Sequence, residues 1–378
     1  MAENTERDIF VHAHQLDSDS EREAYLNKAC ADRPDLLNRV KKLFDANAIE
    51  DGFLATPAVN TTLAFSNGGL TERGGTVIGR YKLLERIGEG GMAVVYMAEQ
   101  DQPVRRKVAV KIIKPGMDTE SVIARFEAER QALAMMEHPH IAKIFDGGAT
   151  DAGRPYFVME LVRGVPITEY VDQNKLGTRE RLGLFMYVCE AVQHAHQKGI
   201  IHRDLKPTNI LVALHDGKPI PKVIDFGIAK ATQSRLTEKT LFTRFQFFVG
   251  TPAYMSPEQA HMDSMDIDTR ADIYALGTLL YELLTGFTPF EPKELTCFED
   301  CRRTILEKEP VRPSSRVPTL SVSEQTTTAN RRRTESSQLI RLLRSDLDWI
   351  TMKCLEKDRT RRYETASALA QDVHRYLD

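Results

Sequence analysis

The stretch from Ile201 to Asn209, with the sequence IHRDLKPTN, constrains the fold and chemistry of this chain more than any other. It places a carboxylate at Asp204, an ammonium at Lys206 and an amide at Asn209, close enough for one short loop to aim all three at a common point. Phosphoryl transfer uses an acid that accepts a proton, a cation that neutralises phosphate charge and an amide that ligates a metal. A second carboxylate follows at Asp225, in the sequence Asp-Phe-Gly. The pattern predicts a site for phosphoryl transfer.

A glycine-rich turn lies nearer the N-terminus, between two stretches with the composition of β-strands. Backbone N–H groups in such a turn can approach a phosphate because no Cβ stands in the way. A strand follows the turn instead of a helix, so it is not a dinucleotide-binding fingerprint. By itself the turn is equally compatible with a plain β-hairpin. Its residues are Ile87, Gly88, Glu89, Gly90, Gly91, Met92, Ala93, Val94 and Val95.

One lysine interrupts the next apolar strand. Lys111 lies within the run Val108–Ile113, where a buried ammonium is costly unless it is paired. The alternative interpretation is a lysine on an edge strand that extends its side chain into solvent.

Taken in chain order, these motifs resemble those of eukaryotic-type (Hanks-type) bacterial serine/threonine protein kinases. Ser256-Pro257-Glu258 stands where that family has Ala-Pro-Glu, and Ala93 replaces the third glycine of the turn. The sequences of the motifs and of the C-terminal residues are similar to those of kinases from bacteria such as planctomycetes. The resemblance covers about residue 80 to the end. It implies an α+β fold with two lobes, a five-stranded N-lobe with one main helix and a mainly helical C-lobe, preceded by a small helical extension.

The resemblance implies a role for each polar residue of the opening motif. Asp204 would accept the proton of the acceptor hydroxyl, and Lys206 would steady the γ-phosphate of ATP. Asn209 and Asp225 would hold Mg²⁺. The cofactors implied are therefore ATP and Mg²⁺.

The same resemblance assigns the residues that would contact the nucleotide. Lys111 would position the α- and β-phosphates while paired with Glu129, and Glu127 is the competing partner. The remaining contacts would come from the hinge strand and the floor of the adenine pocket. Together with the glycine-rich turn, the expected contacts are Ala109, Lys111, Met159, Glu160, Val162 and Leu211.

Four further residues would be structural. Asp272, in an apolar helix, would accept backbone N–H groups near His202 and Arg203. Glu258 would pair with Arg362. Arg203 would pair with a phosphate group carried by a residue of the activation loop. The candidates for that phosphate are Thr243 first and then Thr240.

The composition changes along the chain and predicts its domains. Residues 1–55 are expected to form a helical N-terminal extension, and residues 56–79, rich in Thr, Asn and Gly, a linker. The protein kinase domain would occupy residues 80–378. Within it, the N-lobe would span 80–162 and the C-lobe 163–378.

Residues 308–340 are rich in Pro, Ser, Thr and Arg, which predicts a flexible insertion in the C-lobe. The basic run Arg331–Arg333 at its end is compatible with docking to an acidic partner or RNA, or with a solvated loop. No aromatic residues interleave the charges, which favours the solvated loop. Trp349, the single tryptophan, is expected in the core.

Composition also limits which binding partners and which cellular compartment we expect. The net charge of −3 provides no bulk attraction to nucleic acid or to an anionic membrane, so no nucleic-acid partner is expected. Five scattered cysteines without a C-x-x-C pair fit a reducing cytoplasm. No apolar run is long enough to span a bilayer. The expected partners are ATP and proteins with Ser or Thr acceptors, and a homodimer would serve autophosphorylation.

A protein serine/threonine kinase controlled by autophosphorylation of its activation loop is the function that these features favour. The alternative is a catalytically weak pseudokinase scaffold that acts through its N-terminal helices. Every catalytic position is filled, which favours the active phosphotransferase.

Overall fold

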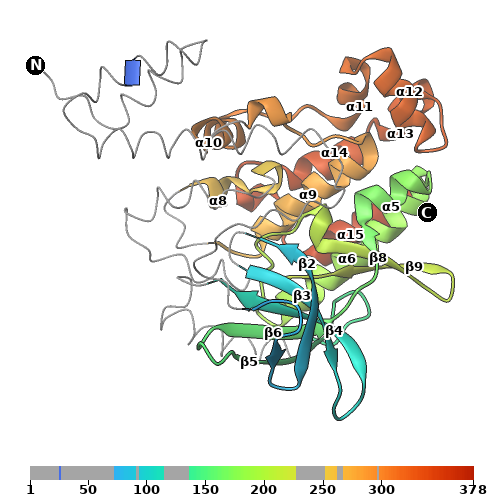
Figure 1. Cartoon of the computed structure of the whole chain (residues 1–378). Coiled ribbons are helices and arrows are strands. Elements are labelled where there is room, and N and C mark those ends of the chain that lie inside the picture. The colour runs from blue at the N-terminus through green and yellow to red at the C-terminus, as the bar shows by residue number, and fades with distance from the viewer. Residues whose placement is uncertain are drawn as a thin grey trace, which may run out of the picture. The chain divides into compact units, whose positions relative to one another are not determined.

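The computed structural model describes residues 25–26, 72–90, 93–114, 136–226, 252–261, 267–295 and 298–378 (Figure 1). The chain divides into two compact units, Met1–Asn67 and Gly68–Asp378, and the elements described below belong to the second. Tyr25 and Leu26 are helical, and the rest of the helical extension predicted for residues 1–55 lies outside the described residues.

An antiparallel sheet forms the N-lobe, in the order β1-β2-β3-β4-β6-β5. Its strands are β1 Val77–Ile78, β2 Tyr81–Glu89, β3 Ala93–Gln100, β4 Arg106–Ile113, β5 Ile144–Ala149 and β6 Pro155–Glu160. Within the described ranges the sheet has six strands where five were predicted. The additional strand is β1, whose two residues pair with Lys82 and Tyr81 at the edge of β2.

The start of the sheet also differs from the predicted linker. Residues 72–79 fall at the end of the stretch assigned to the linker, yet they are hydrogen-bonded to the sheet. Gly75 donates its N–H to the carbonyl of Leu83, and Leu83 donates back to Thr76, both at 2.8 Å. Gly75 has a φ of +95°, a conformation that glycine adopts without steric cost. The glycines that suggested a linker here form the turn that returns the chain to the sheet.

Alternation along β4 gives the sheet a core face and a site face. Val108 and Val110 are fully buried in the apolar core of the sheet. Ala109 and Lys111 point to the opposite face, where Lys111 lies across from Val95 in the ladder between β3 and β4. An apolar strand can therefore carry Lys111 because every second position faces the site.

A three-stranded sheet frames the predicted catalytic loop. Its strands are β7 Val165–Pro166, β8 Ile210–His215 and β9 Lys218–Val223. Strands β8 and β9 form the predicted hairpin, with φ values of +50° at Asp216 and +76° at Gly217. Positive φ at both central residues defines a type I′ turn, which Asp-Gly forms readily. The hairpin returns the chain from Asn209 to Asp225, beside the loop that it left.

Helices form most of the C-lobe. They include α5 Ile167–Gln173, α6 Thr178–Gln197, α8 Pro257–Ala260, α9 Arg270–Thr285, α10 Phe298–Glu307, α14 Asp346–Cys354 and α15 Ala366–Leu377. Buried apolar side chains of α5, α6, α9, α14 and α15 form one continuous core. No helix in the described ranges is long and apolar enough to cross a membrane.

The insertion predicted to be flexible at 308–340 is instead folded into packed helices (Figure 1). These are α11 Pro313–Arg316, α12 Val322–Asn330 and α13 Ser336–Leu343. Ser321 starts α12 with a reciprocal capping box to Glu324. The Ser314 hydroxyl donates to the buried carboxylate of Asp348 at 2.6 Å. The prediction was wrong because serines that suggested disorder act here as a helix cap and as a buried hydrogen-bonding group.

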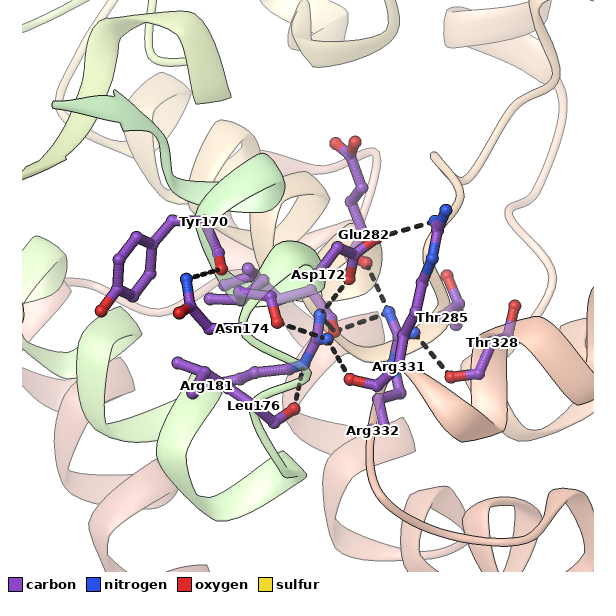
Figure 2. Close-up of polar contacts among 12 residues, drawn as sticks. Tyr170, Asp172, Asn174, Leu176, Arg181, Glu282, Thr285, Thr328, Arg331 and Arg332 are labelled. Atoms are coloured by element: carbon purple, nitrogen blue, oxygen red, sulfur yellow. Dashed lines mark hydrogen bonds and ion pairs between the residues drawn. The ribbon is translucent and has the colours of Figure 1, made fainter.

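The middle residue of the basic run at the end of the insertion is buried in the fold (Figure 2). Arg332 is 2% exposed, and its guanidinium donates to the carbonyls of Leu283 at 2.9 Å and Thr328 at 3.0 Å. Leu283 lies in the last turn of α9, where helical carbonyls have no partner in their own helix. Arg331 forms an ion pair with Asp172 at 2.9 Å. Neither a docking surface nor a solvated loop describes Arg332, because its side chain is buried and its two terminal nitrogens donate to backbone carbonyls.

Trp349 was expected in the core, and the structure corrects this. Its side chain is 55% exposed, whereas Leu347 and Ile350 on the same helix are buried. The helical repeat of 3.6 residues puts these two side chains on the core face of α14 and Trp349 away from it. The indole meets the ring of Tyr363 edge-on at 6.2 Å and the ammonium of Lys353 at 4.6 Å.

Candidate active site

The loop between α6 and β8 brings together the three polar groups of the opening motif. Asn209 Nδ2 donates to the backbone carbonyl of Asp204 at 2.8 Å and lies 3.3 Å from its carboxylate. Lys206 Nζ lies 3.0 Å from the same carboxylate. A short 3₁₀ turn, Pro207–Asn209, folds the amide back toward Asp204. The loop therefore gathers an acid, a cation and an amide, as the spacing predicted.

Asp225 joins this loop to the N-lobe sheet. Lys111, on the site face of β4, forms an ion pair with its carboxylate. Phe226 is buried, and its ring lies 4.7 Å from the ring of His202 in the catalytic loop. The ion pair shows that Lys111 extends into the site and not into solvent. Glu129, its predicted partner, lies outside the described residues.

Asp272 on α9 holds the backbone of the catalytic loop in place through hydrogen bonds. Its carboxylate accepts the backbone N–H groups of His202 and Arg203, each at 2.8 Å, as predicted. The ring of His196 contacts the same carboxylate at 2.7 Å. Burial alone would raise the pKa of Asp272, but the hydrogen bond with His196 and the charges around it outweigh burial and hold the pKa below its ordinary value. The carboxylate therefore stays ionised and keeps both N–H groups in place.

Replacing Asp272 with Asn is expected to lower the free energy of unfolding by about 2–3 kcal/mol at neutral pH, because hydrogen bonds to a charged group are lost. The pKa of the folded Asp272 is depressed below 3.8. Its contribution is therefore complete above that pH and is lost as the pH falls through the folded value. Urea denaturation should show a difference from wild type that is constant at higher pH and shrinks below about pH 4.

The control for this prediction is Asp151→Asn, at an exposed position in the turn between β5 and β6. It is expected to match wild type across the pH range, because an exposed carboxylate contributes little. A difference between Asp272→Asn and wild type that persists unchanged into acid would contradict the assignment.

The glycine-rich turn joins β2 and β3 as a hairpin. Gly90 donates its N–H to the carbonyl of Ala93 at 2.9 Å, which closes the turn. Glu89 forms an ion pair with Lys114 at 2.6 Å, so its side chain is held by the sheet. Ile87, Gly88, Val94 and Val95 lie in the paired strands, and Gly91 and Met92 lie outside the described residues.

The predicted hinge residues lie where β6 leaves the sheet. Met159 pairs across the ladder with Ala109 on β4. Glu160 ends β6, and its carboxylate forms an ion pair with Lys222 at 2.8 Å. Val162 follows in the connection to β7, while Leu211 lies on β8. Residues of both lobes thus border the connection between them.

The activation segment is described only at its end, so Thr240 and Thr243 lie outside the described residues. Ser256 is fully buried and begins α8. The carboxylate of Glu258 receives two hydrogen bonds from the guanidinium of Arg362, at 2.7 and 2.8 Å. This predicted pair fixes the end of the segment to the last part of the chain.

Two contacts near the site were not predicted. Gln259 Nε2 donates to the backbone carbonyl of Arg203 at 2.8 Å. The Tyr254 hydroxyl donates to the carboxylate of Glu282 on α9, and burial raises the pKa of that carboxyl. The Ser-x-x-Gln spacing from Ser256 is a signal for a capping box, but nothing local points to the contacts with Arg203 or Glu282.

Comparison with known proteins agrees with this geometry. A sequence model of the protein kinase domain matches residues 81–374. The serine/threonine-protein kinase Pkn1 of Myxococcus xanthus is 40% identical over 223 residues, which cover 58% of this chain and 31% of Pkn1. The serine/threonine-protein kinase PknB of Mycobacterium leprae is 34% identical over 303 residues, which cover 78% of this chain and 43% of PknB. The chain thus spans less than half the length of these two relatives.

Solved structures agree on the fold. A crystal structure of the Mycobacterium tuberculosis PknI kinase domain, a double mutant, aligns with a TM-score of 0.59 at 22% identity and covers 82% of this chain and all of that domain. A crystal structure of the same domain without those substitutions aligns with a TM-score of 0.57. The family match over residues 81–374 shows that the chain belongs to the protein kinase family, with bacterial Hanks-type serine/threonine kinases among its relatives.

Proposed function

We propose that this chain transfers the γ-phosphate of ATP to serine and threonine hydroxyls of proteins. The observation that carries the proposal is the meeting of Lys111 with Asp225 beside the loop that holds Asp204, Lys206 and Asn209. Two cations, two carboxylates and an amide are thereby gathered from both lobes. This is the set of groups that phosphoryl transfer uses for positioning and charge neutralisation.

The donor set at Asn209 and Asp225 fits Mg²⁺, which binds carboxylate and carbonyl oxygens. Asn209 Nδ2 faces Asp204, which leaves Oδ1 as the ligating atom of this amide. Once bound, Mg²⁺ would neutralise charge on the phosphate oxygens of ATP. The chain itself supplies the two ligands and holds them next to each other through the β8–β9 hairpin.

The residues around the acceptor hydroxyl have distinct proposed roles. Asp204 orients the hydroxyl and accepts its proton, since its carboxylate is the acid that the loop gathers beside Lys206 and Asn209. Lys206, 3.0 Å from that carboxylate, steadies the γ-phosphate by its charge. Lys111 positions the α- and β-phosphates, and Glu129 is its proposed partner in the nucleotide-bound state. Because these groups come from different elements, their alignment depends on the fold as a whole.

Regulation by phosphorylation of the activation loop is part of the proposal. Arg203 directly precedes Asp204, and a phosphate on the loop would give its guanidinium a charge-assisted partner. Thr243 and then Thr240 are the proposed acceptors. Transfer between two copies of the chain would place the phosphate there, which makes a transient homodimer the proposed route.

The alternative, a pseudokinase scaffold, has less support. It would be favoured by a missing base, metal ligand or phosphate-binding lysine. Asp204, Asn209, Asp225 and Lys111 are all present, and their side chains are brought into one site.

Incubation of the chain with ATP labelled on its γ-phosphate tests the proposed function. With Mg²⁺ we expect label on the chain itself or on a generic protein substrate, recovered as phosphoserine or phosphothreonine. Chelation of the metal should reduce transfer by at least about 100-fold, because the phosphate charge is then not neutralised. No transferred label with Mg²⁺ present would refute the proposed function and favour the scaffold.

A further inference from the structure

The residue after Ser256-Pro257-Glu258 links the end of the activation segment to the catalytic loop. Gln259, on α8, donates through Nε2 to the backbone carbonyl of Arg203 at 2.8 Å. Its Oε1 accepts the backbone N–H of Ser256 at 3.0 Å and the Ser256 hydroxyl at 3.2 Å. One amide side chain thus spans two segments that are 56 residues apart in the sequence.

The orientation of this amide is determined at both ends. A backbone N–H only donates, so Ser256 selects the oxygen of the Gln259 amide. A backbone carbonyl only accepts, so Arg203 selects the nitrogen. A glutamate has nearly the same shape and keeps the contact with Ser256, but it would set a carboxylate oxygen against the Arg203 carbonyl. The contact with Arg203 therefore requires an amide at this position.

The carbonyl that Gln259 holds belongs to the peptide unit that leads into Asp204. The carbonyl of Arg203 and the N–H of Asp204 lie in one rigid plane. Arg203 itself has a φ of +63°, which is unfavourable for a residue with a Cβ. Its N–H is held by Asp272 at 2.8 Å and its carbonyl by Gln259 at 2.8 Å. The two contacts together hold Arg203 in this conformation. They also fix the orientation of the peptide plane from which the Asp204 side chain extends.

We propose that Gln259 is a positioning residue for phosphoryl transfer. It fixes the peptide plane that carries Asp204, and so makes the placement of the proton-accepting carboxylate depend on the end of the activation segment. The inference rests on the proposed kinase activity. Gln259 acts through Arg203 and contacts no reacting atom itself.

Two simpler roles for Gln259 predict outcomes that differ from those of a positioning role. If Gln259 only caps α8, Gln259→Glu should behave as wild type, because a glutamate also accepts from Ser256 at the third helical position. If Gln259 only shapes the surface that receives the protein substrate, its replacement should raise the KM for a peptide and leave hydrolysis of ATP by water unchanged. A positioning role predicts loss of kcat with both acceptors, since both need Asp204.

The test compares Gln259→Glu with a matched control, Gln325→Glu. Gln325, on α12, also donates through Nε2 to a backbone carbonyl, that of Leu320 at 2.9 Å, but far from the site in the sequence. For Gln259→Glu we expect kcat to fall by about tenfold or more with peptide and with water, because a small misplacement of a catalytic group has this effect. The KM for ATP should stay within about twofold, and Gln325→Glu should match wild type.

Hydrogen exchange of the backbone at residues 202–206 gives a readout that does not depend on turnover. Exchange should be about tenfold faster in Gln259→Glu than in wild type or in Gln325→Glu, because the loop opens more often. If wild type transfers no phosphate, the proposed function fails while this measurement still decides the role of Gln259. Should Gln259→Glu fail to fold, Gln259→Leu removes the donor to Arg203 and also the acceptor for Ser256. Faster exchange at residues 202–206 in Gln259→Leu then reports the lost contact with Arg203, because loss of the α8 cap alone would leave that loop unchanged.

Three results would overturn the inference. The first is a kcat for Gln259→Glu equal to that of wild type. The second is a change confined to the KM for the peptide. The third is unchanged exchange at residues 202–206, which would show that the loop is held without Gln259.

Discussion

Replacing Asp204 with Asn is expected to lower kcat for protein phosphorylation by about 10³-fold, because an amide cannot accept the proton of the acceptor hydroxyl. The two side chains have nearly the same shape, so the loop should keep its fold. Asn209 Nδ2 can still donate to the backbone carbonyl at position 204, its closer contact at 2.8 Å. The ion pair with Lys206 is partly exposed and contributes little to stability.

Initial rates with a Ser/Thr peptide, the affinity for ATP and the unfolding temperature together check this prediction. The affinity for ATP should stay within about twofold, since Asp204 is expected to act on the acceptor and not on the nucleotide. Asp216→Asn is the matched control, because Asp216 occupies an exposed turn where Asn is well tolerated at positive φ. Retention of more than about a tenth of the wild-type kcat in Asp204→Asn would exclude Asp204 as the proton acceptor.

Part of this site follows from local chemistry. The spacing of Asp204, Lys206 and Asn209 within one short loop predicts that they converge, and the structure brings them together. Alternation in a strand explains how Lys111 can leave the apolar core. The Asp-Gly pair at Asp216 predicts the hairpin that returns the chain to the site. Each of these statements needs only neighbouring residues.

The longer connections came from the family resemblance and not from local patterns. Asp272 contacts His202 across 70 residues, and Glu258 contacts Arg362 across 104 residues. Neither hydrophobic periodicity nor secondary-structure propensity predicts such a pairing, because the partners meet only after the helices pack. The contact from Gln259 to Arg203 is also distant in sequence, and none of the family motifs found in the sequence predicts it.

The errors in prediction also have physical causes. Composition suggested disorder at 308–340, but Arg332 forms hydrogen bonds to carbonyls of α9 and α12. A sequence does not indicate which backbone carbonyls will accept a hydrogen bond from a distant side chain. The short strand β1 depends on a glycine turn that also fits a linker. Trp349 was assigned to the core, whereas its place on α14 is set by which face of the helix packs.

Replacing Arg362 with Met is expected to lower the free energy of unfolding by about 3–5 kcal/mol, because it leaves the partner of a buried ion pair uncompensated. The Arg362 side chain is fully buried and bonds both oxygens of Glu258. Its guanidinium also donates to the carbonyls of Glu356 at 2.8 Å and Arg270 at 2.9 Å. Met fills a similar volume but donates nothing, so the carboxylate and these carbonyls lose their partner together.

Urea denaturation of Arg362→Met, Glu258→Gln and the double variant measures this effect and its origin. The double variant should lose less than the sum of the single variants, by about 1–3 kcal/mol, since the two side chains contact each other directly. Arg361→Met is the matched control one position away, because the Arg361 side chain is 73% exposed and its Nε lies 4.0 Å from the Asp358 carboxylate. That control should stay within about 0.5 kcal/mol of wild type. A loss in Arg362→Met no larger than in Arg361→Met would show that the end of the activation segment is held by other contacts.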